Sequence, residues 1–143
     1  MTPTPYEAIY GRFLSKIKDY PILEQIKQGN TAFVKRMLHR YLEGAISNFL
    51  YGGEKLKNRD NDLEQFNESL TDLEMEILAK LMVVEYLSPV LINSDKIEKR
   101  LSSKDFNEFS SANLIGQIRE IKNSEYKDAN DLMIVNYHRG GFQ

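Results

Sequence analysis

The chain has 143 residues, of which 41% are hydrophobic and 28% charged, and its formal net charge at pH 7 is −2. These values fit one folded domain and exclude a disordered chain or a general nucleic-acid binder, which would be strongly basic. The absence of cysteine excludes disulfides and thiolate metal sites. The first residues lack the features of a signal peptide, and the apolar run 77–92 is too short for a membrane span, so we expect a cytosolic protein without membrane contact.

The first predicted helix begins at Thr4, which can cap it, because Pro5 tolerates the first helical position and Glu7 completes a capping box. Apolar residues then recur at helical spacing and predict one buried face: Tyr6, Ile9, Tyr10, Phe13, Leu14 and Ile17. The residue before a proline avoids helical geometry, so this helix should end near Pro21. One or two further helical turns are expected over 22–28.

A second helix is predicted to begin at Asn30 or Thr31 and to stop at the glycine pair 52–53. Its buried stripe contains Val34, Leu38, Tyr41, Leu42, Ala45, Ile46 and Phe49. The segment 60–76 holds seven acidic residues and no basic one, and we expect its first part to be a loop or a short helix.

The third helix should be the central one. Thr71 and Glu74 form a second capping box at its start, flanked by Leu70 and Met75 as a hydrophobic staple. The stretch 77–87 is apolar almost all round, as expected of a helix packed on several sides. A proline at position 89 should end or kink this helix.

The last third of the chain again shows only helical patterns. Asn93 or Ser94 can cap a short helix through Leu101, and Ser103 can start a longer one. Inward positions on this longer helix and on a last helix are Phe106, Phe109, Leu114, Ile118, Ile121, Tyr126, Ala129, Leu132 and Met133. Residues 132–137 could also pass as a strand.

These elements together predict an all-α fold in a single domain. Residues 1–134 should form a helical bundle of about five main helices, and residues 135–143 an extended C-terminal arm. The arm contains two aromatic residues, which is unusual because chain ends are commonly polar and frayed.

Catalytic and metal motifs are weak. His39 and Glu43 are four residues apart on a predicted helix, but the neighbouring bases would repel a cation, and neither histidine has the glutamate three residues before it that di-iron bundles use. Asp60, Asp62 and Glu64 match the start of a calcium loop, yet the glycine and glutamate required later in that loop are missing. The glycines fit no nucleotide-binding pattern. We therefore expect no enzymatic activity, no metal and no cofactor.

Two features suggest nucleic-acid contact. Lys35, Arg36 and Arg40 form the best basic patch, and residues 139–142 form a single RGG-like unit. Such units bind RNA as repeats, and no helix presents a run of Arg, Lys, Asn and Gln for reading base edges. A small helical DNA-binding regulator therefore remains the alternative interpretation.

Three stretches carry a family resemblance: PYEAIYGRFLSKIKDY (5–20), DLEQFNESLTDLEMEILAKLMVVEYLSP (62–89) and KDFNEFSSAN (104–113). They resemble the small helical head–tail connector proteins of long-tailed bacteriophages, also called adaptor or head-completion proteins. The resemblance implies a homo-oligomeric ring beneath the portal protein, commonly with its twelve-fold symmetry, through which genomic DNA passes. It also implies that the next neck or tail-completion protein docks below the ring. Such a protein is in the host cytoplasm during assembly and then in the virion neck, and it has no catalytic residues.

The charge distribution is compatible with such a ring. Residues 1–57 carry nine Lys or Arg and five Asp or Glu, giving +4, whereas residues 58–143 carry ten and sixteen, giving −6. Opposed basic and acidic faces can form head-to-tail interfaces, although two solvated faces would give the same pattern. The acidic segment could instead line the DNA passage. The candidates for the ring interface or the lumen are Lys35, Arg36, Arg40, Asp60, Asp62, Glu64 and Glu68.

The resemblance further implies that the C-terminal arm grips the portal. Tyr137 and Phe142 would be aromatic anchors, Arg139 a carboxylate or carbonyl clamp, and Gly140 and Gly141 a hinge. The full set of portal-binding candidates is Tyr137, His138, Arg139, Gly140, Gly141 and Phe142. A disordered tail, or one folded onto its own bundle, is the alternative.

Overall fold

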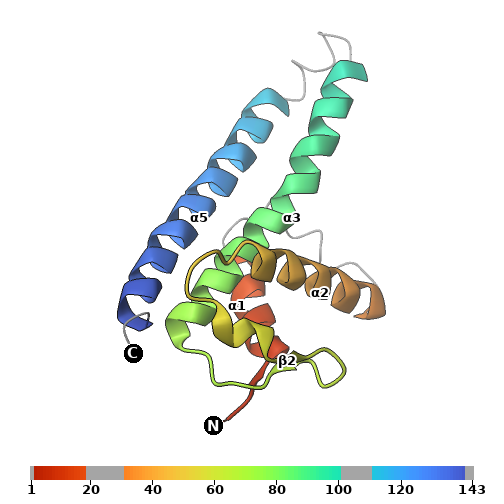
Figure 1. The fold of residues 1–143 in the computed structure, drawn as a ribbon. Helices are drawn as coiled ribbons and strands as arrows, with labels where there is room; N and C mark the ends of the chain where they lie inside the picture. Colours follow the sequence, from red (N-terminus) through yellow and green to blue (C-terminus); the bar gives the residue numbers. More distant parts are fainter. Residues whose placement is uncertain (1, 19–30, 101–110, 141–143) are drawn as a thin grey trace.

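The computed structural model describes residues 2–18, 31–100 and 111–140. Within these residues there are four α-helices: α1 (Tyr6–Lys18), α2 (Thr31–Ser47), α3 (Asp72–Arg100) and α5 (Ser111–Gly140). The remaining elements are a 3-10 helix, η2 (Glu54–Lys57), and three two-residue strands, β1 (Thr4–Pro5), β2 (Arg59–Asp60) and β3 (Gln65–Phe66). Figure 1 shows α3 at the centre, with the other helices packed around it.

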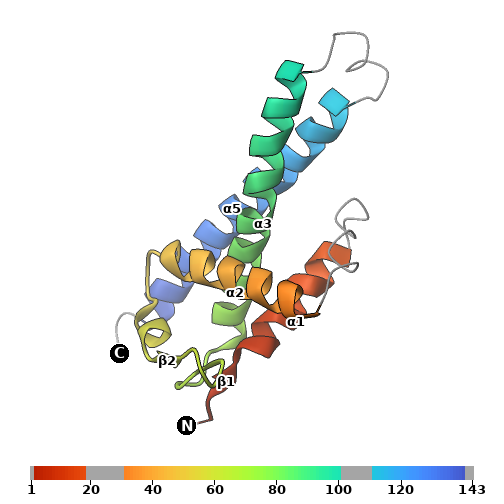
Figure 2. The ribbon, with the colours of Figure 1, turned by 90° about the vertical axis from the view of Figure 1, so that its right-hand side faces the viewer.

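Helix α3 packs on several sides because the stretch 77–87 in its first half is apolar almost all round, as the sequence predicts. Seven of its side chains have no exposed surface: Ile77, Leu78, Ala79, Leu81, Met82, Val83 and Leu87. Helices α1 and α2 cover this half, and α5 runs antiparallel along α3 for most of its length (Figures 1 and 2). The second half of α3 and the first half of α5 therefore project beyond α1 and α2 as a pair.

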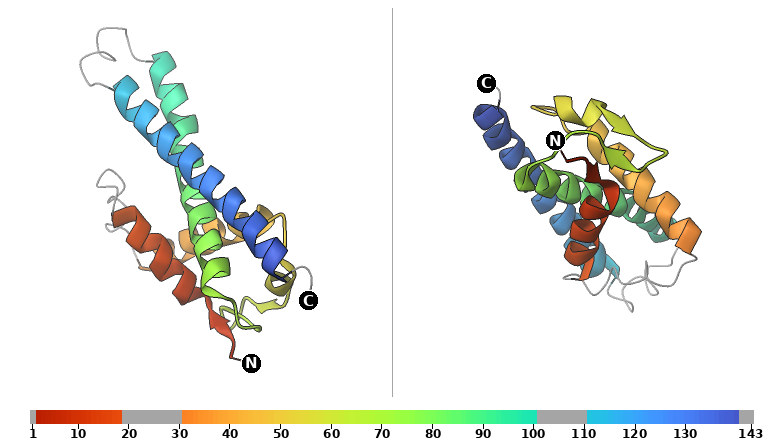
Figure 3. Two further views of the ribbon diagram at one scale, coloured as in Figure 1. Left: turned by 90° about the vertical axis from the view of Figure 1, so that its left-hand side faces the viewer. Right: turned by 90° about the horizontal axis from the view of Figure 1, so that it is seen from below.

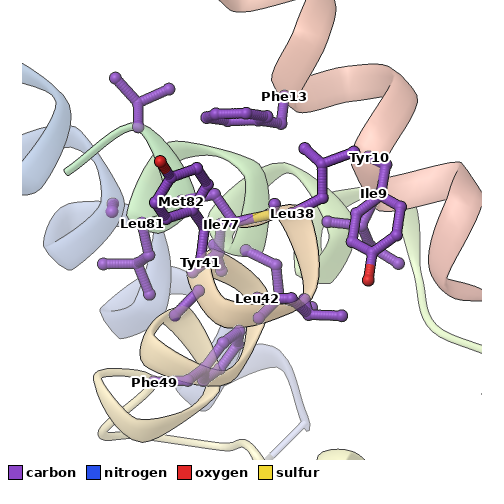
Figure 4. Close-up of a cluster of buried hydrophobic side chains, with 14 of the residues drawn as sticks. Ile9, Tyr10, Phe13, Leu38, Tyr41, Leu42, Phe49, Ile77, Leu81 and Met82 are labelled. Carbon is purple, nitrogen blue, oxygen red and sulfur yellow. The ribbon is translucent and has the colours of Figure 1, made fainter. Parts of the chain in front are cut away.

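The core lies where α1, α2 and α3 meet (Figure 4). It contains Ile9, Tyr10 and Phe13 from α1, Leu38, Tyr41 and Leu42 from α2, and Ile77, Leu81 and Met82 from α3. Three aromatic rings join these helices: Phe13, Tyr41 and Tyr86 have centroids 5.6 to 6.0 Å apart, with tilted or edge-on rings. Such geometry is favourable beyond the area it buries, so the three rings fix how the helices meet.

A small antiparallel sheet closes one end of the bundle. Its strand order is β1-β3-β2, with Thr4 opposite Phe66 and Arg59 on the other side of Phe66. The Thr4 hydroxyl accepts a hydrogen bond from the Leu70 backbone N–H (2.9 Å) and donates one to the Glu68 carbonyl (3.2 Å). The predicted cap of α1 by Thr4 is therefore wrong: the hydroxyl bonds to a segment more than sixty residues away.

The predicted all-α bundle of about five helices is only partly correct. The fold is mostly helical, but it includes the three-stranded sheet, and α3 combines two predicted helices into one. Pro89 lies inside α3 rather than at its end. Proline removes one helical hydrogen bond, and packing of α5 along α3 beyond this point, with Leu91, Ile115 and Ile118 buried, offsets that loss. The Thr71–Glu74 capping box is confirmed in both directions, at 2.9 and 3.1 Å.

The prediction of an extended C-terminal arm is wrong for residues 135–140. Residues 135–140 continue α5 to Gly140, because Ala129 and Met133 are buried against the bundle just before them and the helix needs no break there. The proposed boundary after residue 134 therefore falls inside a helix. The predicted helical turns over 22–28, the predicted start at Ser103 and residues 141–143 lie outside the described residues.

The Thr4 hydroxyl should contribute measurably to stability. Thr4→Val keeps the side-chain shape but leaves the Leu70 N–H and the Glu68 carbonyl without this partner, which should lower the free energy of unfolding by about 1–3 kcal/mol. Urea unfolding measures the difference. The control is Thr2→Val at an exposed position of the same terminus, and equal stability of the two variants would contradict the assigned role.

Candidate interaction surfaces

An exposed apolar surface lies at the end of the molecule where α5 terminates. We define the end patch as Leu50, Tyr51 and Tyr137, whose exposed fractions are 60%, 45% and 47%. The Tyr51 and Tyr137 rings lie edge to face with centroids 6.4 Å apart. Large apolar side chains gathered in one exposed place commonly mark a protein-binding surface.

The chain reaches this arrangement through a sharp turn after α2. Helix α2 ends at Ser47, and Gly52 has a φ of +70°, a conformation that side chains other than glycine rarely adopt. A Cβ atom at Gly52 would lie 3.5 Å from the Tyr137 Cα and 3.3 Å from the Asn136 side-chain nitrogen. The turn therefore lies directly against α5 and places Tyr51 beside Tyr137.

The portal-binding residues predicted from the sequence are only partly described. Tyr137 belongs to the end patch, and His138 and Arg139 are exposed on the last turn of α5. Gly140 is the last helical residue, so a hinge at the glycine pair would begin where α5 ends. Gly141 and Phe142 lie outside the described residues. Leu50 and Tyr51 were not predicted as interface residues. Their position, two large apolar residues directly before a glycine pair, could have identified them.

The three bases of the predicted basic patch lie on α2. Lys35, Arg36 and Arg40 are all exposed, and Arg36 and Arg40 are one helical turn apart. His39, between them, instead faces the bundle: its Nε2 is 3.5 Å from Glu43 Oε1, and its ring lies 6.0 Å from that of Tyr6.

Glu43 is bound to the hairpin between β2 and β3 rather than free to hold a metal. Its Oε2 accepts a hydrogen bond from Arg59 at 3.2 Å, and Arg59 also donates to the Leu56 carbonyl at 2.8 Å. The Tyr6 hydroxyl donates to Asn61 Oδ1 at 2.6 Å, and burial raises the pKa of Tyr6 although the charge of Arg59 opposes this. Burial also raises the pKa of Tyr10. The hydrogen bonds of Tyr6 and Arg59 tie the hairpin to α1 and α2.

The acidic segment does not form one negative surface. Asp62 and Glu64 are exposed near the hairpin tip, where Asp60 Oδ1 accepts hydrogen bonds from the backbone N–H groups of residues 62 and 63. Glu68 is half-buried, and its carbonyl accepts the Thr4 hydroxyl. The later acids lie in the first turns of α3 and pair with bases from elsewhere in the chain: Asp72 with Arg12, Glu74 with Lys55, and Glu76 with Arg12 and Lys16.

A shallow groove of about 620 Å³ runs along the outer face of α1. Its small lining residues are Ala8, Gly11 and Ser15, and a Cβ atom built at Gly11 would meet nothing within 4 Å. Its charged lining residues are Glu7, Arg12 and Lys16 from α1 and Glu76 from α3. We call this feature the α1 groove.

Three of the charged residues that line the α1 groove interact with one another, because Arg12 and Lys16 both pair with Glu76. Burial raises the pKa of Glu76, but the hydrogen bond and charge of Lys16, the charge of Lys80 and the hydrogen bond from Arg12 outweigh it. The net result holds the pKa of Glu76 below its usual value of 4.5. Glu76 is therefore ionised at neutral pH and joins α1 to α3.

Comparison with protein-family models, with curated proteins and with solved structures found no match for this chain. Among the described helices, none is long and apolar enough to cross a membrane. In the same part of the chain, no three His, Cys, Asp or Glu side chains are grouped so that they could hold a metal ion.

The ion pairs of Glu76 should make stability depend on pH. A lowered pKa in the folded state means that the contribution is complete above the unfolded value of 4.5 and is lost as the pH falls through the folded value. Glu76→Gln should therefore be about 1 kcal/mol less stable than wild type at pH 7, and the difference should shrink toward pH 3. Urea unfolding at both pH values measures it, and a pH-independent difference would exclude this role.

Proposed function

We propose that the protein is a structural adaptor of a bacteriophage neck, without enzymatic activity, that forms a ring beneath the portal and connects the DNA-filled head to the tail. The family resemblance of three sequence stretches suggests this role. The observation that carries it further is the end patch, in which Leu50, Tyr51 and Tyr137 are held exposed at one end of the molecule. An adaptor needs such a surface for the protein above or below the ring.

The end patch has the composition of an interface core. Tyrosine is enriched at the energetically important positions of protein interfaces, because its ring buries a large area while its hydroxyl keeps a polar partner. Two tyrosines in edge-to-face contact, next to an exposed leucine, form a surface that is partly ordered before binding. In this proposal the end patch docks on the portal, together with His138 and Arg139 on the last turn of α5.

The exposed charges suit contacts between copies or with the DNA in the lumen. Lys35, Arg36 and Arg40 on α2 are separated in sequence from Asp62 and Glu64 at the hairpin tip, and all five are exposed. Complementary charges of this kind steer association and fix the orientation of partners more than they add affinity.

The alternative is a small DNA-binding regulator, favoured by the basic patch on α2. Three exposed bases on one helix could contact phosphates, but the net charge of the chain is −2. A regulator would prefer one operator sequence and lose its binding steeply as salt rises, whereas an adaptor should be indifferent to DNA sequence.

Purified protein should assemble into closed rings of identical subunits, alone or when the portal is added. Native mass spectrometry and negative-stain imaging measure the number of subunits, for which the resemblance implies twelve. Gel-shift assays with unrelated DNA fragments should show no sequence preference. A protein that stays monomeric with the portal and binds one fragment selectively would favour the regulator instead.

Charge introduced in the end patch should weaken portal binding without unfolding the chain. Tyr51→Asp combined with Tyr137→Asp places two carboxylates in the contact and should weaken binding to portal complexes by at least about thirtyfold, since two interface tyrosines commonly contribute about 2 kcal/mol or more. Co-sedimentation with portals measures it.

The matched control for this test is Leu63→Asp, which adds one carboxylate at an apolar side chain that is 66% exposed on the hairpin tip. This variant should bind portals like wild type. Portal binding that survives the double substitution would show that the contact with the portal lies elsewhere on the chain.

A further inference from the structure

The basic patch on α2 differs from the bases that hold the bundle together. Lys35, Arg36 and Arg40 are exposed, and among the residues that the structure describes no acidic side chain pairs with them. The only acidic residue of α2, Glu43, is bound to Arg59 of the hairpin. Five bases on other elements are instead paired with acids of the same chain: Arg12, Lys16, Lys55, Arg59 and Lys80.

The arrangement of the basic patch is unfavourable for α2 itself. Arg36 and Arg40 are four residues apart, so their like charges lie one helical turn from each other and lower the stability of the helix. The first turn of α2 contains no acidic residue that could offset them. A negatively charged partner would remove this repulsion, so the charge distribution indicates that the patch has an anionic partner.

The outer face of α2 is accessible to such a partner. Figure 2 shows α2 in front of α3, and no other described helix or strand crosses over it. Figures 1 and 3 show α5 on the opposite side of α3. The row from Lys35 to Arg40 spans about 7.5 Å of the helix axis at 1.5 Å per residue. An elongated anion can therefore contact all three bases without meeting another element first.

Duplex DNA is the anion that fits both this surface and the proposed function. It carries one negative charge per about 1.7 Å of its axis, so a row of this length faces several phosphates. The guanidinium group of arginine matches the geometry of phosphate oxygens, and two of the three bases are arginines.

The contact should not depend on the DNA sequence. Helix α2 contains no asparagine or glutamine, the side chains that read adenine in the major groove. Phosphates, in contrast, are the same in every sequence. The formal net charge of −2 keeps the binding of each copy weak. A weak contact that is the same at every position would let DNA slide past it.

We propose that the outer face of α2 lines the DNA passage of the assembled ring, and that Lys35, Arg36 and Arg40 contact the phosphates of the passing duplex without reading its sequence. The inference rests on the proposed ring function and names the surface that meets the DNA. Because the ring repeats the patch once in every subunit, several weak contacts act together. The end patch remains available for the portal.

The salt dependence of DNA binding tests this contact. Fluorescence anisotropy with a labelled 20-base-pair duplex of arbitrary sequence measures the affinity of the assembled protein between about 50 and 200 mM salt. Lys35→Gln, Arg36→Gln and Arg40→Gln together should weaken binding at least about tenfold at the lower salt concentration. They should also reduce the slope of log K against log salt by about 2.7 for each copy in contact, since each phosphate contact contributes about 0.9.

The matched control removes three bases that are scattered over other elements. Lys57→Gln on η2, with Lys122→Gln and Lys127→Gln on α5, lowers the formal net charge by the same amount, from −2 to −5. This variant should bind DNA like wild type. The basic-patch variant should be at least as stable as wild type in urea, because it loses the repulsion between like charges. Its weaker DNA binding would then not result from unfolding.

A probe on α2 locates the contact, because the natural chain contains no cysteine. Ser47→Cys, labelled with iron-EDTA, places a source of hydroxyl radicals at an exposed position of α2. The bound duplex should be cleaved evenly along its sequence. The same label at Ser124→Cys on α5 should cleave little or none of the DNA. Equal cleavage from both positions would overturn the inference.

The remaining outcomes separate this inference from the proposed function. Rings that bind the portal, but whose affinity for DNA is equal in wild type and in the basic-patch variant, would overturn the inference and leave the adaptor role standing. Loss of rings in that variant alone would also overturn it, because the bases would then hold copies together. A preference of more than about tenfold for one duplex sequence would overturn it and favour the regulator. A chain that is monomeric with and without portal would contradict both.

Discussion

The fold depends on one constraint: the stretch 77–87 of α3 is apolar on almost every side and must be covered from several directions at once. Helices α1, α2 and α5 each cover one side, and the rings of Phe13, Tyr41 and Tyr86 fix three of the helices relative to one another. Because each covering helix is a single layer, its outer face remains on the surface. The bundle therefore keeps an exposed outer face on each of α1, α2 and α5.

The helices could be predicted because their signals are local. Apolar residues recur every three or four positions in α1 and α2, and the Thr71–Glu74 capping box marks the start of α3 within one turn. The sheet could not be predicted, since strands of two residues are too short to show an alternation of polar and apolar side chains. Thr4 was misassigned for a related reason: its hydroxyl fits a helix cap locally, but the backbone at Glu68 and Leu70 competes for it. From its local sequence, Pro89 likewise predicts the end of a helix, but α3 continues through it because α5 packs along α3 beyond this position.

The surfaces show the same difference between features set by local sequence and features set by contacts between distant residues. The sequence identified exposed bases on α2 correctly, because exposure follows from their place on a helix opposite the buried stripe. It could not tell that Asp72, Glu74 and Glu76 are paired with Arg12, Lys55 and Lys16, since those partners are 19 to 64 residues away. The end patch depends on Gly52, whose positive φ lets the chain turn so that Tyr51 contacts α5. A pattern of apolar residues along the sequence does not predict such a turn.

These pairings bear on how copies of the chain would recognise one another. If the acids at the start of α3 were free, attraction to the bases of α2 would be the obvious contact between copies, and it would weaken with salt. Arg12 and Lys16 neutralise part of that charge within the same chain. Under the proposed function, the remaining charges at Lys35, Arg36 and the hairpin tip would then guide the approach of copies rather than hold them together.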